Sequence, residues 1–138
     1  MSVNYQSRTG AVLFAARVDK VASFYSNVLG LVEVHRDDDH ILLESPSFQL
    51  VVHRIPGHFN TTTELTEQPV RRAGASFKPV FFVASLGSVR KAAAAHGGTM
   101  EAPEKEWSFN GVAVCDAIDP DGNVIQFRET EGARDQLA

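Results

Sequence analysis

The sequence predicts an α+β domain in which two βαβββ units form curved mixed sheets around a cleft. Three observations lead to this fold class. The length of 138 residues fits one domain. An apolar strand, an amphipathic helix and several further strands follow one another twice along the chain. The two copies also align without gaps, because Val12 falls on Val80, a shift of 68 positions. We expect one domain over 1–138, with units at about 10–54 and 78–130 and a linker loop over 55–77.

The first unit is expected to begin with a buried strand over 11–16, which is a short apolar run. Asp19 is a candidate N-cap for the following helix, whose apolar residues recur at helical spacing up to Leu29. Gly30 is expected to end this helix in the left-handed conformation. Further strands are predicted over 31–35, 40–44 and 48–54, separated by turns at 37–39 and 45–47.

The second unit repeats this order after a segment, 55–77, that has no clear periodicity and is expected to be a linker or a loop over a site. A strand is predicted over 80–86, and Ser88 is a candidate cap for a helix that ends at Gly97-Gly98. The remaining strands are predicted over 99–102, 111–118 and 124–129. Residues 119–122 read Asp-Pro-Asp-Gly, which is typical of a tight turn joining the last two strands.

The duplication predicts how the units assemble. Identical residues occupy equivalent places in both, namely Val12 and Val80, Phe14 and Phe82, Ala16 and Ala84, Val21 and Val89, Gly30 and Gly98, and Glu33 and Glu101. One helix covers only one face of its sheet, so the other face of each unit stays open. Two open faces can meet around a concave, largely apolar cleft of the kind that small molecules occupy. A second chain is expected to complete this cleft in a symmetric homodimer.

Composition excludes several classes of partner. The formal net charge is −4, and the basic residues are scattered, so no nucleic-acid partner is expected. No apolar run approaches the roughly 20 residues of a membrane helix, and the amino terminus lacks a signal-peptide pattern, so no membrane partner is expected. The single cysteine, Cys115, excludes an internal disulfide and fits a reducing compartment. We therefore expect a cytoplasmic protein.

Several short motifs resemble one known family over nearly the whole chain, from about Thr9 to Glu131. They are Phe24-Tyr25 with Val28-Leu29-Gly30, Ala95-His96-Gly97-Gly98, Trp107, and Asp119-Pro120-Asp121-Gly122-Asn123 followed by Val124-Ile125-Gln126. On these residues the sequence resembles the vicinal oxygen chelate superfamily, which includes glyoxalases, extradiol dioxygenases, fosfomycin-modifying enzymes and bleomycin-binding resistance proteins. The resemblance implies the paired βαβββ fold and leaves the activity open.

The resemblance also implies where a metal ion would be bound. Metal-dependent members carry His and Glu ligands on the first and last strands of each unit, and the matching positions here are Gly10, Lys78, Gln126 and either Gln49 or Val51. Glycine offers no side chain, the lysine cation repels a metal ion, and amide oxygens bind transition metals weakly. We therefore expect no metal and no cofactor.

Strand alternation predicts the residues of the cleft. Gln49, Val51 and His53 should face it, because the alternate residues of that strand are more uniformly apolar. The full set of candidate ligand-binding residues is Phe14, Gln49, His53, Lys78, Phe82, Trp107, Gln126 and Arg128. Lys78 and Arg128 would favour an anionic or carbonyl-bearing ligand.

Six of the eight candidates also have a structural alternative. Phe14 and Phe82 would equally suit a core, and Trp107 a barrel end or a dimer contact. His53 would suit a strand end, and Lys78 and Arg128 an exposed surface. Among the remaining side chains, turn positions predict exposure of His35, His40 and His58, His96 falls at a helix end, and Cys115 is expected to be an inert buried thiol. Arg71-Arg72 would either reach over a bound ligand or remain in a solvated loop.

Three functions stay open at this point. The first is a binding protein that sequesters an apolar or aromatic organic molecule. The second is a metal-independent lyase or isomerase, with His53 as the candidate general base and Lys78 or Arg128 stabilising an oxyanion. The third is an atypical metal-dependent enzyme of the same superfamily, such as a dioxygenase, in which His53 and either Glu44 or Glu129 gather the ion.

Overall fold

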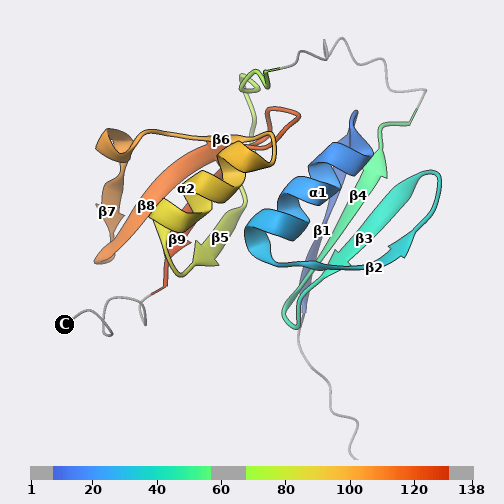
Figure 1. Cartoon of the computed structure of the whole chain (residues 1–138), viewed down its shortest axis with the longest axis horizontal. Coiled ribbons are helices and arrows are strands. Elements are labelled where there is room, and N and C mark those ends of the chain that lie inside the picture. Colours follow the sequence, from blue (N-terminus) through green and yellow to red (C-terminus); the bar gives the residue numbers. More distant parts are fainter. Residues whose placement is uncertain (1–7, 57–67, 131–138) are drawn as a thin grey trace, which may run out of the picture.

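A computed structural model describes residues 8–56 and 68–130 and confirms the α+β class, with two small mixed sheets and two helices (Figure 1). The first sheet has the strand order β1-β4-β3-β2, and the second has β5-β9-β8-β6, with β7 also paired to β8. Strands β1 and β4 are parallel, as are β5 and β9, and the other pairs are antiparallel. The elements in chain order are β1 (Thr9–Ala15), α1 (Val18–Leu29), β2 (Val32–Arg36), β3 (His40–Glu44), β4 (Phe48–Arg54), β5 (Val80–Val83), α2 (Leu86–Ala95), β6 (Thr99–Met100), the 3₁₀ turn η1 (Pro103–Lys105), β7 (Trp107–Phe109), β8 (Val112–Ile118) and β9 (Val124–Glu129).

Four local expectations are wrong, each for a physical reason. The strand expected over 80–86 ends at Val83, because Ser85 already caps a helix that begins at Leu86. Asp19 does not cap α1, because the helix already begins at Val18 and Asp19 lies in its first turn. Ser85 rather than Ser88 caps α2, since its hydroxyl oxygen accepts a hydrogen bond from the Ser88 backbone N–H at 3.2 Å. The charged stretch around Trp107 was not expected to form a strand, yet β7 pairs with β8 there.

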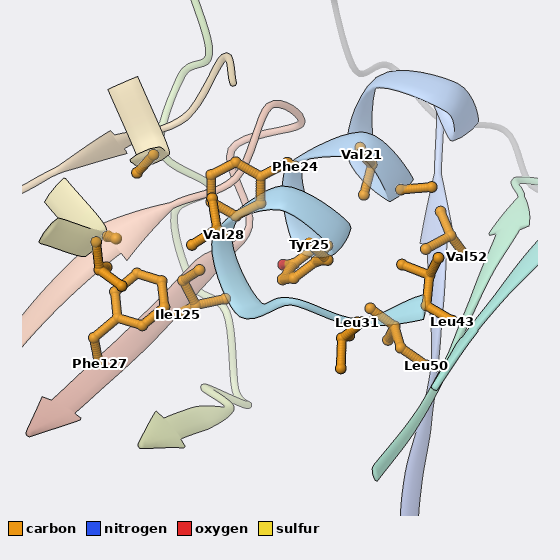
Figure 2. Close-up of a cluster of buried hydrophobic side chains, with 14 of the residues drawn as sticks. Val21, Phe24, Tyr25, Val28, Leu31, Leu43, Leu50, Val52, Ile125 and Phe127 are labelled. Carbon is orange, nitrogen blue, oxygen red and sulfur yellow. The ribbon is translucent and has the colours of Figure 1, made fainter. Parts of the chain in front are cut away.

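One hydrophobic core joins the two sheets through α1. Figure 2 shows this helix between Leu43, Leu50 and Val52 of the first sheet and Ile125 and Phe127 of the second. Contact between the halves is close at Gly98, where an added Cβ would lie 2.4 Å from a Phe24 ring carbon and 2.6 Å from the Ile118 carbonyl oxygen. Both sheets therefore turn one face to a shared, helix-lined core.

We call the other face of each sheet, turned away from the helices, its open face. Large apolar side chains are exposed on both, including Val12 and Phe14 on the first and Phe82, Trp107 and Phe109 on the second. The predicted open faces are thus present, and each exposes large apolar side chains in the described part of the chain, although Val114 and Gln126 on the second are buried. In the described part of the chain, neither helix has the length and apolarity to cross a membrane.

A buried polar cluster ties the second unit to the first. The Asp119 carboxylate accepts hydrogen bonds from the Tyr25 hydroxyl at 2.8 Å, from the backbone N–H groups of Asp121 and Asn123, and from the Asn123 side-chain amide. Asp121 in turn accepts a 2.7 Å bond from the Ala16 backbone N–H, just before α1. The Asp-Pro-Asp-Gly turn therefore does more than reverse the chain, because it anchors α1. Gly122 in this turn has the expected positive φ of 84°.

Because Tyr25 is buried and hydrogen-bonded to Asp119, we expect the free energy of unfolding to depend on pH. Burial raises the pKa of Tyr25 above its usual 10.0, and the Asp119 charge adds to the shift. Because the folded-state pKa lies above the unfolded one, the stabilising contribution is complete below pH 10 and declines above it. We expect Tyr25→Phe to cost about 1–3 kcal/mol at pH 7. This difference from the wild type should shrink by up to about 1.4 kcal/mol per pH unit above pH 10. Urea unfolding at pH 7, 10 and 11 measures it, and a constant difference would contradict the assignment.

Candidate functional site

The open face of the second sheet carries a row of aromatic and basic side chains. Strand register places Phe82, Arg128 and Val114 side by side, and Trp107 pairs with Val114 at the far edge. The Arg128 guanidinium lies over the Phe109 ring, 4.6 Å from its centre. Phe82 is 63% exposed and Trp107 42% exposed, so the core-packing alternative for Phe82 is wrong.

A chain of polar contacts runs along the same face. Lys78 Nζ donates to Asp116 Oδ2 at 3.0 Å, and Gln126 Nε2 donates to Asp116 Oδ1 at 3.1 Å. The Gln126 carbonyl Oε1 accepts a bond from Arg128 Nε at 2.8 Å. Arg71, from the loop before β5, approaches Asp116 at 4.0 Å and Glu101 at 3.3 Å. The contacts fix Gln126 and leave the terminal nitrogens of Arg128 without a hydrogen-bond partner among the described residues.

Sequence reasoning missed Asp116, the residue that organises this chain of contacts. Its side chain is only 13% exposed, and it gathers two cations and one amide. A signal for it existed, because Asp116 is the single charged residue inside the otherwise apolar strand 112–118 and shares the alternation of Val112 and Val114. A charge at that position of a strand indicates a partnered polar site.

The open face of the first sheet has a different character, because it is rich in histidine. The Phe14 ring contacts the His53 ring edge-on at 5.6 Å, and His53 stacks on His40 at 5.9 Å. Gln49 lies further along β4 and donates to Glu44 at 2.9 Å. Burial of Leu50 and Val52 confirms that Gln49, Val51 and His53 share the open face.

The structure therefore sorts the predicted site residues into two groups. Phe14, Gln49 and His53 lie on the first open face, while the second carries the rest, namely Lys78, Phe82, Trp107, Gln126 and Arg128. A cavity of about 600 Å³ lies between β1 and β5 and is lined by both sheets, including Gly10 and Phe82. His53, Trp107 and Arg128 do not belong to the described residues that line this cavity. One chain thus brings the two groups to its surface without joining them.

Other side chains singled out in the sequence fall outside these two groups. Glu129 accepts a hydrogen bond from the Leu86 backbone N–H at the start of α2, so it does not share an open face with His53. Cys115 is buried as expected, and burial raises the pKa of its thiol. His96 ends α2, and His58 lies outside the described residues. The expected loop 55–77 is described only in part, and there Arg71 reaches the open face through Asp116 while the Arg72 backbone N–H donates to the Gly122 carbonyl.

Comparisons with known proteins agree with this architecture. A sequence model described as a glyoxalase-like domain matches residues 10–127. A glyoxalase-related enzyme from Fulvimarina pelagi is 18% identical, with a TM-score of 0.66 over 91% of this chain and 89% of its own. A lactoylglutathione lyase from Agrobacterium tumefaciens is also 18% identical, with a TM-score of 0.61 over 92% and 96%. A bleomycin resistance determinant encoded on transposon Tn5 is 20% identical, with a TM-score of 0.58 over 88% and 96%. The search of curated proteins finds no match. At these identities the structural likeness shows the fold alone.

Proposed function

Because the chain belongs to the glyoxalase-like domain family, within the vicinal oxygen chelate superfamily, we propose that it binds a small aromatic or apolar organic molecule in a cleft between two open faces. The observation that carries the proposal is the pairing of exposed aromatic rings with a fixed polar chain on the second open face. Rings of this kind stack on a flat ligand, and the polar groups fix its orientation.

The charges on this face select the class of ligand. Lys78, Arg71 and Arg128 bring three positive charges, while Asp116 and Glu101 bring two negative ones. The terminal nitrogens of Arg128, which have no hydrogen-bond partner among the described residues, would add charge-assisted hydrogen bonds to an incoming oxygen. We infer a ligand that carries a carboxylate, an enolate or a polarised carbonyl beside its aromatic part.

Three of the four family positions do not offer a side-chain donor that fits a metal ion. Gly10 has no side chain, and the Lys78 ammonium is paired with Asp116. The carbonyl oxygen of Gln126 already faces the Arg128 guanidinium, so a cation there would meet a positive charge. The proposed function therefore uses hydrogen bonds from this chain's own residues at the place where metal-dependent relatives would use an ion.

A homodimer would complete the cleft. Each open face exposes apolar side chains, among them Val12, Val32 and Val34 on the first and Val80 and Phe82 on the second. Monomeric proteins seldom expose large apolar patches on two faces. A two-fold axis would place the first open face of each protomer against the second open face of its partner. The dimer would therefore contain two equivalent contacts and two clefts. His53 of one chain would then face the Lys78–Arg128 group of the other.

Trp107 provides a direct test, because it is the single tryptophan of the chain and lies on the proposed cleft. We expect at least one member of a panel of planar aromatic carboxylates and ketones to change its fluorescence in a saturable way. Lys78→Met and Arg128→Met should each weaken the binding about 10- to 100-fold, because each removes a charge-assisted hydrogen bond.

Lys91→Met is the matched control, since Lys91 is exposed on α2 and carries the same charge. Its affinity should equal that of the wild type. Absence of binding across the whole panel, or equal losses in all three variants, would contradict the proposal.

One observation favours a lyase or isomerase as a second candidate. His53 Nδ1 lies 2.7 Å from the Arg54 carbonyl oxygen, which can only accept a hydrogen bond. Nδ1 is therefore the donor, and in the neutral imidazole Nε2 carries a lone pair that can take a proton from a substrate. Chemical conversion of a bound panel member by the wild type, and its loss in His53→Gln, would identify this activity.

A further inference from the structure

A second group of polar side chains lies on the first sheet, at the β2–β3 hairpin. Among the residues that the structure describes, His35, Asp37 and His40 form one group whose potential ligand atoms all lie within 4.8 Å of one another. None of them occupies the four positions that the family resemblance implies for a metal. We propose that His35, Asp37 and His40 bind a divalent transition metal ion such as Zn²⁺.

A β-bulge brings the two histidines to the same face. Glu33 pairs with Leu43, but His35 pairs with Leu42, so Val34 is an extra residue in β2. In a regular ladder Val34 would pair with Leu42, and His35 would pair with the buried Ile41 and point toward the helices. With it, His35 joins His40 on the open face, and their rings lie 5.2 Å apart.

Backbone hydrogen bonds orient the carboxylate between the histidines. Asp37 Oδ1 accepts from the N–H groups of Asp39 and His40 at 2.8 and 2.9 Å, and these bonds lower the pKa of Asp37. The carboxylate is therefore charged over the neutral pH range, and its Oδ2 remains directed at His35. Such support of a ligand by a second hydrogen bond is usual at metal sites.

The separations are close to those of ligands around one ion. His35 Nε2 lies 3.5 Å from Asp37 Oδ2, His40 Nδ1 lies 3.1 Å from Asp37 Oδ1, and ligand atoms of the two histidines lie within 4.8 Å of each other. Two ligands about 2.0–2.2 Å from a tetrahedral zinc ion are themselves about 3.3–3.6 Å apart, so small side-chain rotations would bring the three donors around one ion. Three protein ligands leave a further position for water or for a donor of a bound molecule. Imidazole and carboxylate together suit zinc and neighbouring transition metals better than calcium or magnesium.

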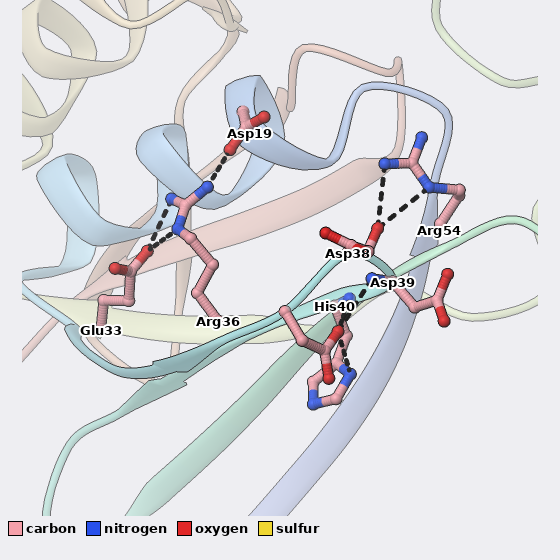
Figure 3. A network of polar contacts seen from close by, with 8 residues as sticks. Asp19, Glu33, Arg36, Asp38, Asp39, His40 and Arg54 are labelled. Carbon is pink, nitrogen blue, oxygen red and sulfur yellow. Dashed lines mark hydrogen bonds and ion pairs between the residues drawn. The ribbon is translucent and has the colours of Figure 1, made fainter.

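Ion pairs hold the hairpin on one side and hydrogen bonds to a backbone carbonyl hold it on the other (Figure 3). Arg36 pairs with Glu33 and with Asp19 of α1, while Arg54 donates to the Asp38 carbonyl oxygen at 3.1 Å. The site is thus held in position before an ion arrives, which reduces the ordering needed for binding.

Calorimetric titration of the untagged full chain with Zn²⁺ at pH 7.5 tests the proposal. We expect one equivalent to bind, and His35→Asn, His40→Asn and Asp37→Asn each to weaken binding at least about tenfold. Asp37→Asn is the most informative, because its amide oxygen can keep both backbone hydrogen bonds while the charge is lost. The wild type should also gain thermal stability with Zn²⁺, and the three variants should not.

His96→Asn is the control, since His96 lies at the end of α2, away from the hairpin. It should bind Zn²⁺ as the wild type does. The proposal is overturned if no saturable binding occurs, if the hairpin variants bind normally, or if His96→Asn loses binding as they do. Because the test uses the metal alone, its failure would leave the proposed ligand cleft unaffected.

Discussion

Replacement of Asp119 by alanine is expected to destabilise the protein by about 3–5 kcal/mol, since it removes the acceptor of a fully buried cluster. Asp119 is 0% exposed and accepts four hydrogen bonds from three residues. Without it the Tyr25 hydroxyl and two backbone N–H groups remain buried without partners. A domain of this size is stable by about 5–15 kcal/mol, so the loss removes a large part of the total. Urea unfolding followed by circular dichroism measures it.

Two variants separate the cluster from a general effect of losing a carboxylate. Asp39→Ala removes an exposed carboxylate in the β2–β3 turn and should change the unfolding free energy by less than about 0.5 kcal/mol. Asp119→Asn keeps one oxygen acceptor. Its loss of unfolding free energy should therefore lie between the losses of Asp39→Ala and Asp119→Ala. A loss below about 1 kcal/mol for Asp119→Ala would mean that the Asp-Pro-Asp-Gly turn does not anchor α1.

Much of this fold could be predicted because local signals and packing agree. Strands β3, β4 and β9 begin and end where the alternation of apolar residues places them. Gly30 ends α1 with a φ of 72°, as its position after Leu29 indicates. The caps of both helices were missed. The N-cap of α1 is Arg17, which makes no side-chain cap bond, and Ser85 rather than Ser88 caps α2.

The candidate sites were harder to predict, because they depend on register and on pairs distant in sequence. Alternation was enough to place Gln49 and His53 on one face. It could not reveal the bulge at Val34, which changes the side of the sheet to which His35 belongs. Asp116 becomes important only once Lys78 and Gln126, distant in sequence, lie beside it.

Charged substitutions on the open faces are expected to dissociate the proposed homodimer. Phe14→Glu changes the first open face and Phe82→Lys the second, and both side chains are about half or more exposed in the single chain, at 46% and 63%. In a two-fold dimer each change enters two symmetric contacts. A burial cost of about 2 kcal/mol in each would weaken dimerisation on the order of 1,000-fold. Sedimentation velocity should show a wild-type dimer, and each variant as a monomer.

Mixing the two variants tests which faces meet. In a heterodimer of Phe14→Glu with Phe82→Lys, one pair of faces is unaltered, and the other places the new glutamate near the new lysine. Dimers should therefore reappear in the mixture, although neither variant forms them alone. Lys91→Glu, which adds a negative charge on α2, should remain dimeric. If the mixture stays monomeric while both variants remain folded, the first open face does not meet the second. A monomeric wild type would mean that any ligand must be held by one open face alone.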